Sequence, residues 1–109
     1  MPEEPARIVF SYQRAAALLP EVRQLTGQAI VRVDDAQRQS EGEAGAQEQL
    51  QSVVTGWADA MVDRGLAVKG LWLVDFDNGS GYYCWRYPET GLEYFHSNEE
   101  GFPGRMRIQ

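Results

Sequence analysis

Residues 71–105 of the chain read LWLVDFDNGSGYYCWRYPETGLEYFHSNEEGFPGR. This stretch holds two of the three tryptophans, four of the five tyrosines, three of the four phenylalanines, and the only cysteine and histidine. Apolar runs separated by Asn-Gly and Pro-Glu-Thr-Gly turn signals are typical of short antiparallel strands. The stretch therefore predicts a three-stranded β-meander over residues 70–96, and it also holds the residues best suited to form a site.

The two turn signals predict which strand residues face each other, because successive side chains point to opposite faces of a sheet. A two-residue Asn-Gly turn places Asp75 opposite Tyr82. A four-residue loop at Pro-Glu-Thr-Gly places Arg86 opposite Glu93. On this register a guanidinium lies between two carboxylates, which predicts either a cross-strand ion-pair network or the grip for a small polar ligand.

The same register divides the strand residues between two faces. We expect the aromatic face to pack on the helices as core, with a ligand-stacking or partner-binding surface as the alternative. This face carries Trp72, Val74, Phe76, Tyr83, Trp85, Tyr87, Leu92, Tyr94 and His96. The other face carries Leu71, Leu73, Asp75, Tyr82, Cys84, Arg86, Glu93 and Phe95.

Two helical patterns precede the strands. Apolar residues recur at spacings of three and four between 22 and 33 and again between 50 and 61, which is typical of amphipathic helices. Ser11 is a candidate N-cap of the first helix, and Pro20 predicts a kink or a fresh helix start. Gly65 is a candidate left-handed C′ residue that ends the second helix in a Schellman-type cap. Within that helix we expect Gly56 to allow close approach of the two helices.

The predicted fold is α+β. It consists of an antiparallel helical hairpin, kinked or broken at Pro20, packed on the three-stranded antiparallel β-meander. We expect one domain over residues 1–109, with a loose tail at 1–6, the helical hairpin at 11–66, the meander at 70–96 and an irregular C-terminal tail at 97–109.

Charge and composition narrow the classes of partner. Ten basic and sixteen acidic residues give a formal net charge of −6, and the basic residues are scattered, so we expect no nucleic-acid partner. No segment approaches the ~20 apolar residues that span a bilayer, so we expect no membrane partner. One cysteine excludes an intramolecular disulfide and a multi-cysteine metal cage. These features predict a cytoplasmic protein.

The single cysteine and histidine suggest two kinds of chemistry. A nucleophilic Cys84–His96 pair needs the thiol within reach of the imidazole, and the predicted register puts the two on opposite faces. A one-residue change in the second loop would bring them directly opposite each other. His96 is the only plausible nitrogen ligand of a metal, together with Asp75 or with Glu93, Glu99 or Glu100. The sequence names neither a metal nor a cofactor.

Five short motifs in order resemble a bacterial family known as domain of unknown function 2203. They are Phe10-Ser11, the run ALLPEVR at 17–23, the run LVDF at 73–76, Cys84-Trp85-Arg86 with Tyr94-Phe95-His96, and the run GFPGR at 101–105. The resemblance spans nearly the whole chain but implies no activity. It marks Asp75, Phe76, Cys84, Trp85, Arg86, His96, Gly101, Phe102, Gly104 and Arg105. Pro103 and the short loop between Phe76 and Cys84 depart from the family pattern.

Two functional hypotheses from different classes follow. The first is a non-enzymatic binding or interaction module whose ligand is unknown, with self-association into a homo-oligomer left open. The alternative is a small enzyme or metal-dependent protein with a site around Asp75, Arg86, Glu93, His96 and Arg105. A structural or stress-related role in partner assembly is a third. Across these hypotheses the binding candidates are Asp75, Cys84, Arg86, Glu93, His96 and Arg105.

Overall fold

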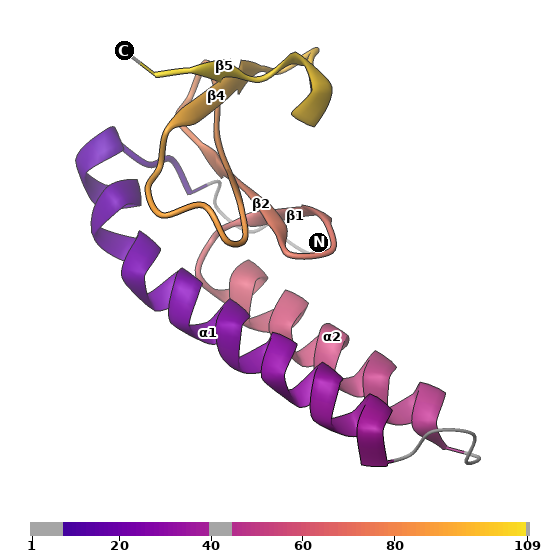
Figure 1. Ribbon diagram of the computed structural model, residues 1–109. Coiled ribbons are helices and arrows are strands. Elements are labelled where there is room, and N and C mark those ends of the chain that lie inside the picture. The colour runs from indigo at the N-terminus through magenta and orange to yellow at the C-terminus, as the bar shows by residue number, and fades with distance from the viewer. Residues whose placement is uncertain (1–7, 40–44, 109) are drawn as a thin grey trace, which may run out of the picture.

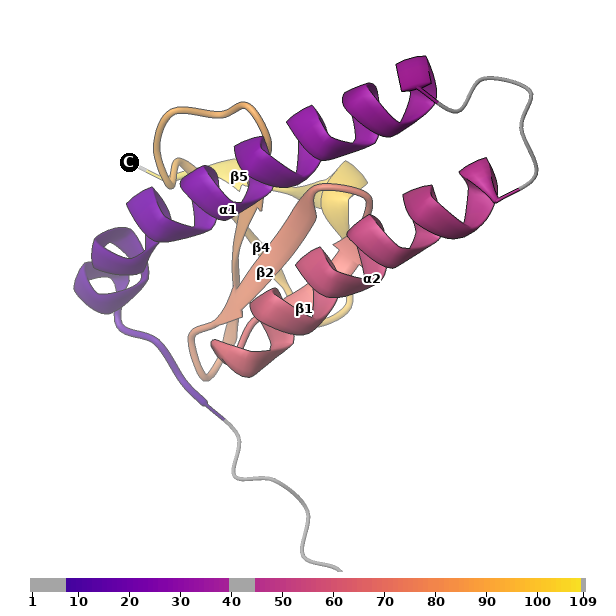
Figure 2. The ribbon, with the colours of Figure 1, turned by 90° about the horizontal axis from the view of Figure 1, so that it is seen from below.

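The computed structural model describes residues 8–39 and 45–108 and has an α+β fold, as predicted. Two helices, α1 (Tyr12–Gln39) and α2 (Ala46–Asp63), lie side by side and pack on one antiparallel sheet (Figure 1 and Figure 2). The sheet has five strands in the order β1-β2-β3-β4-β5. The strands are β1 (Ala67–Gly70), β2 (Leu73–Asp77), β3 (Gly81–Arg86), β4 (Tyr94–Ser97) and β5 (Met106–Arg107).

The prediction of three strands is therefore wrong by one strand at each edge of the sheet. β1 and β5 are only four and two residues long, and such short strands carry almost no alternation that sequence patterns can detect. β5 lies in the segment that was expected to be irregular, where it pairs with β4 after a short 3₁₀ turn at Phe102–Gly104. The tail at residues 1–6 lies outside the described residues.

The first helix begins where the sequence indicates. The Ser11 hydroxyl accepts a hydrogen bond from the Arg14 amide at 3.2 Å, and α1 starts at the next residue. The helix continues through Pro20, so the alternative of a break there is wrong. A proline inside a helix removes one backbone hydrogen bond, which bending can accommodate, and the axis of α1 curves in Figure 1.

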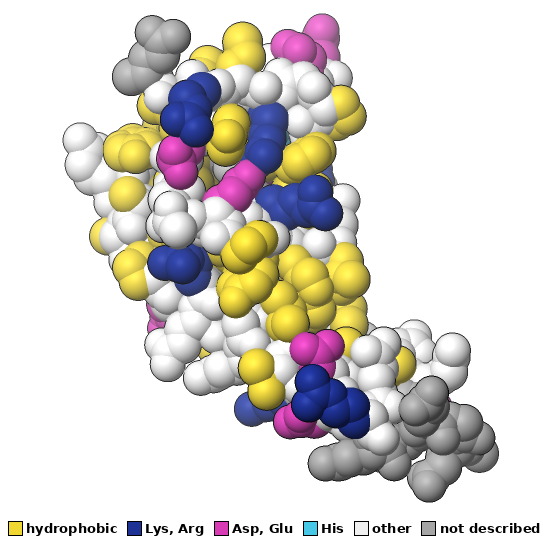
Figure 3. Space-filling model, in the orientation of Figure 1, with side chains coloured by type: hydrophobic (Ala, Val, Ile, Leu, Met, Phe, Trp, Pro, Cys, Tyr) yellow, Lys and Arg dark blue, Asp and Glu magenta, His cyan; other side chains and the backbone are white. Residues whose placement is uncertain are grey.

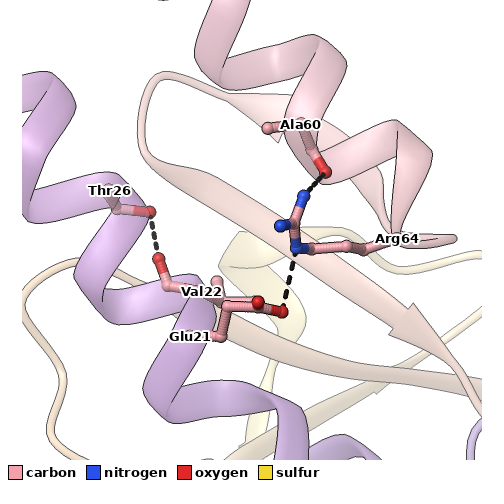
Figure 4. A network of polar contacts seen from close by, with 5 residues as sticks. All are labelled: Glu21, Val22, Thr26, Ala60 and Arg64. Carbon is pink, nitrogen blue, oxygen red and sulfur yellow. Dashed lines mark hydrogen bonds and ion pairs between the residues drawn. The ribbon is translucent and has the colours of Figure 1, made fainter.

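Polar contacts join the two helices at their sheet end (Figure 4). Arg64, just after α2, donates to Glu21 of α1 at 3.0 Å and to the Ala60 carbonyl at 2.8 Å. Deeper between the helices, the Thr26 hydroxyl donates to the Val22 carbonyl and accepts a 2.8 Å bond from the Trp57 indole. Thr26 is fully buried, so this hydroxyl satisfies a tryptophan that would otherwise carry an unpaired N–H in the core.

A Schellman cap ends α2, as predicted. Gly65 has φ +89°, its amide bonds the Val62 carbonyl, and the Leu66 amide bonds the Met61 carbonyl. The chain then turns through β1 into a tight connection in which Trp72 has φ +62°, a rare conformation for a bulky side chain. The Trp72 ring packs edge-on against Trp57 with centroids 4.9 Å apart. This contact fixes the first strand connection to the helices.

Both predicted strand registers are wrong, with different consequences. β2 and β3 pair with Asp75 opposite Cys84, a shift of two residues that leaves every side chain on its predicted face. The Asn78 side chain causes the shift, since its carbonyl accepts the Ser80 and Gly81 amides and extends the turn to four residues.

Between β3 and β4 the shift is one residue and reverses the face of β4. His96 lies opposite Tyr82, and Cys84 lies opposite Tyr94. The connecting loop is held by Glu89, whose side chain and backbone accept hydrogen bonds from the Arg86 amide and the Trp85 indole. His96 and Tyr94 therefore leave the aromatic face and join the face that carries Asp75.

The remaining aromatic face packs on the helices, as expected. Val74, Phe76, Trp85 and Leu92 belong to one buried cluster with Val22, Trp57 and Met61 of the helices. On the face drawn in Figure 3, basic and acidic side chains lie beside one another instead of forming a patch of one sign. Among the described helices, none combines the length and apolarity needed to cross a membrane.

Candidate functional site

Three potential donor side chains meet on the face of the sheet that points away from the helices. Asp75 on β2, Cys84 on β3 and His96 on β4 are all buried, with exposed fractions of 2%, 1% and 3%. A carboxylate oxygen, the thiol sulfur and a ring nitrogen lie within 4.8 Å of one another. Asp75 and Cys84 are direct cross-strand neighbours, and His96 is diagonal to Cys84. Three adjacent strands therefore hold the cluster.

Both ring nitrogens of His96 are engaged. Nδ1 lies 2.8 Å from the Ser97 carbonyl oxygen, which can only accept, so Nδ1 carries a proton. Nε2 lies 2.8 Å from Oδ2 of Asp75. The carboxylate and a bare Nε2 would both be acceptors and would repel each other. Either a second ring proton or a cation in the place of that proton must therefore lie between them.

One oxygen of the same carboxylate has no partner. Oδ1 of Asp75 is buried and accepts no hydrogen bond from the described residues. Buried polar atoms are almost always satisfied, because a group that leaves water without a new partner is destabilised by about 1–3 kcal/mol. The neighbouring Cys84 thiol is only a weak donor to this carboxylate, so Oδ1 lacks the strong partner that a buried carboxylate oxygen normally has.

The electrostatic surroundings keep the Cys84 thiol neutral. Burial and, secondarily, the neighbouring carboxylate of Asp75 together raise its pKa from 9.0 to about 12, although the positive charge of Arg105 acts in the opposite direction. A nucleophilic cysteine requires the opposite shift. The structure thus brings Cys84 and His96 to one face, contrary to the predicted register, but burial and Asp75 outweigh the positive charge of Arg105 and raise the thiol pKa instead of lowering it.

Arg105 closes the cluster from the C-terminal segment. Its guanidinium lies between the rings of Tyr94 and Phe102, 3.9 and 4.2 Å from their centroids. It also forms an ion pair with Glu89 at 2.6 Å. The charge on Arg105 is thus neutralised by Glu89, which lies in the loop that follows β3. The two aromatic rings hold the guanidinium beside Cys84.

A pocket of about 380 Å³ opens above the cluster. Asp75 and His96 lie in its wall together with Tyr82, whose ring is 5.2 Å from that of His96. The rim carries two glutamates, Glu99 and Glu100, both exposed. Lys69 lies on the same rim, with its ammonium 5.6 Å from the centroid of the Tyr82 ring. The pocket thus connects the buried cluster with solvent.

The other two predicted site residues lie apart from the cluster. Arg86 is exposed at the end of β3 with its guanidinium 5.6 Å from the Phe102 ring, and Glu93 pairs with Arg107 at 3.4 Å. The predicted network of Asp75, Arg86 and Glu93 does not form, because it required the wrong registers.

Sequence patterns also missed three neighbours of the cluster. Tyr82 packs beside His96 from a strand face, Lys69 lines the same pocket from a short edge strand, and Glu89 pairs with Arg105 from a loop. Of these three residues, only Tyr82 could have been found from the sequence, because it directly follows the first turn and lies on the predicted face of Cys84.

The fold and the cluster together define a small α+β protein with a buried Asp–Cys–His cluster on the outer face of its sheet. The chain belongs to the family described as Uncharacterized conserved protein (DUF2203), whose model matches residues 8–108. This confirms the resemblance in the motifs. No curated protein and no solved structure matches the chain.

Proposed function

We propose that the protein is a non-enzymatic binding module that takes a small cation in the pocket above Asp75 and His96. The observation that carries the proposal is the buried carboxylate oxygen Oδ1 of Asp75, which has no partner among the described residues. A bound cation would satisfy this oxygen at the place where the pocket reaches the cluster.

The charge of the pocket favours a positive ligand. Its lining carries the carboxylates of Asp75, Glu99 and Glu100 but only one ammonium group, that of Lys69. Carboxylates gathered around a concave, partly enclosed surface raise the local concentration of cations. The same carboxylates would repel an anionic ligand.

Two features argue against catalysis by the same residues. A general base needs an unprotonated ring nitrogen that faces its substrate, whereas Nδ1 of His96 faces the Ser97 carbonyl and Nε2 faces the carboxylate of Asp75, each at 2.8 Å. A nucleophilic thiol needs a depressed pKa, and that of Cys84 is raised to about 12. The cluster is therefore better suited to hold a ligand than to transfer a proton or form a covalent intermediate.

Native mass spectrometry on protein purified without chelators or an affinity metal tests the proposal directly. We expect a homogeneous cation adduct that Asp75→Asn loses. Glu93→Gln is the matched control, because it removes one carboxylate from a residue that pairs with Arg107 and does not line the pocket. The same spectra report whether the protein self-associates.

Rim variants test the charge argument without disturbing the buried pair. Zn²⁺ and propylammonium serve as the inorganic and organic probe cations in calorimetric titrations. We expect Glu99→Gln to weaken binding of the cation that binds and Lys69→Met to strengthen it, since both side chains are exposed at the rim. Failure of both probes, or equal affinities in both variants and the wild type, would overturn the proposal.

A further inference from the structure

We infer that Asp75, Cys84 and His96 form a binding site for a divalent transition-metal ion, to which each of three neighbouring strands contributes one ligand. This inference rests on the proposed binding function and names the class of its cation. It depends on the chemistry of the donors, their spacing, the orientation of the imidazole and the balance of charge, each of which the structure defines separately.

The donor set is selective. A thiolate, an imidazole nitrogen and a carboxylate oxygen are together typical ligands of Zn²⁺ and of related first-row ions. Mg²⁺ and Ca²⁺ instead prefer ligand sets made of oxygen atoms alone. All three side chains are buried, so this cluster differs from the acidic groups that gather by chance on protein surfaces.

The spacing of the donors is close to that of a loaded site. Two donors each about 2.0–2.1 Å from a tetrahedral ion lie about 3.3 Å apart. Nε2 of His96 and Oδ2 of Asp75 are 2.8 Å apart, and all three ligand atoms fall within 4.8 Å. Binding of an ion would require the first pair to separate by roughly 0.5 Å and the thiol sulfur to move toward both atoms.

The imidazole already has the orientation that metal ligation requires. Metal-binding histidines almost always donate their second ring N–H to a carboxylate, a backbone carbonyl or water, which fixes the tautomer. In His96 the Nδ1–H donates to the Ser97 carbonyl at 2.8 Å. The lone pair that remains on Nε2 of the neutral ring then points toward the carboxylate of Asp75, which would satisfy its unpaired Oδ1 as well if it bound the ion through both oxygens.

The charges balance when a divalent ion is bound. One thiolate and one carboxylate neutralise a dication, which a buried site tolerates far better than an unpaired charge. The neighbouring positive charge of Arg105 does not upset this balance, because Glu89 pairs with it at 2.6 Å. Asp75 and His96 also line the pocket, so a fourth coordination position would face solvent.

Cobalt spectroscopy of the full-length, chelator-treated protein provides a test that does not depend on activity. Co²⁺ bound to a thiolate shows a sulfur-to-metal charge-transfer absorption in the near ultraviolet. We expect this band to saturate at one ion per chain and to disappear when Zn²⁺ is added. Mg²⁺ in excess should leave it unchanged, because it disfavours sulfur and nitrogen ligands.

Matched variants assign the ligands. Cys84→Ser should abolish the charge-transfer band and weaken Co²⁺ binding by more than the about 10–100-fold that loss of an outer partner of a ligand causes. Asp75→Asn should weaken binding but keep the band. Glu93→Gln, at a carboxylate outside the cluster, should change neither. The wild-type spectrum alone decides on thiolate ligation if Cys84→Ser fails to fold.

The outcomes separate this inference from the proposed function. Absence of the charge-transfer band in the wild type, or full binding by Cys84→Ser, overturns the three-ligand site. If Co²⁺ and Zn²⁺ do not bind but propylammonium does, with the expected effect of Glu99→Gln, the metal inference fails and the binding module stands. If neither metal nor propylammonium binds, both fail.

Discussion

Cys84 on β3 lies directly opposite Asp75 on β2, so a thiol and a carboxylate are buried side by side on one face of the sheet. Their proximity couples the charge of one group to the ionisation of the other. The thiol has a pKa of about 12 in the fold against 9.0 in the reference state, mainly through burial and secondarily through Asp75.

Stability of the metal-free protein should fall as the pH rises from about 9 to about 12. Over this range the folded protein keeps the thiol proton that the unfolded chain has released, so the free energy of unfolding decreases with pH. Urea titrations of chelator-treated protein at several pH values measure the slope. Cys84→Ala is the control, because it removes the contribution of the thiol while tyrosines and Lys69 still titrate. Identical slopes in both proteins would contradict the pKa shift.

The buried pair of Asp75 and His96 should contribute far more to stability than an exposed ion pair. His96→Ala leaves the carboxylate buried without its partner, which we expect to cost about 3–5 kcal/mol of unfolding free energy. Glu21→Gln breaks the pair with Arg64, whose side chains are 30% and 53% exposed, and should cost about 0–1 kcal/mol. Chemical denaturation compares the two variants, and equal losses would show that His96 is not structurally paired.

Gly81 should be the glycine least tolerant of substitution near the site. An added Cβ there would lie 2.7 Å from the His96 carbonyl oxygen, so Gly81→Ala must push β4 away from β3. We expect a loss of about 1–3 kcal/mol, typical of overpacking, together with weaker cation binding. Thermal unfolding and the cation titrations measure the two effects.

Gly56→Ala supplies the control for that substitution. A Cβ at Gly56 meets nothing within 4 Å, so close helix approach does not explain this glycine, contrary to the expectation from sequence. Since Gly56 lies inside α2, alanine should stabilise the protein by about 0.5–1 kcal/mol and leave cation binding unchanged. Destabilisation by Gly56→Ala would show a contact that this structure lacks.

The hydrogen bond between Thr26 and Trp57 should be a major polar contribution to helix packing. Thr26→Val keeps the side-chain shape but leaves the buried indole N–H without an acceptor, which should cost about 1–3 kcal/mol. Thr26→Ser retains the hydroxyl and should cost less than Thr26→Val. A Thr26→Val/Trp57→Phe double-variant cycle measures the coupling, and strictly additive effects would exclude the bond.

The two turns show which parts of the strand pairing the sequence predicts and which parts it does not. Turn residues located both hairpins, but the Asn78 side chain accepted backbone amides and lengthened the first turn by two residues. An even shift kept Asp75 and Cys84 on their predicted face. The conformation of the second loop depends on Glu89, which accepts hydrogen bonds from the end of β3. No local sequence motif predicts these bonds. The odd shift that resulted moved His96 to the other face and assembled the cluster.

The separation of the two sheet faces also divides the chromophores of the protein. All three tryptophans lie on the helix side: Trp57 and Trp85 are in the core, and Trp72 packs against it. Tyr82, in contrast, lies beside His96 in the pocket. Excitation at the red edge, where only indole absorbs, therefore reports folding without direct sensitivity to the pocket. Difference absorption of tyrosine reports occupancy of the pocket, so one sample carries two independent optical signals.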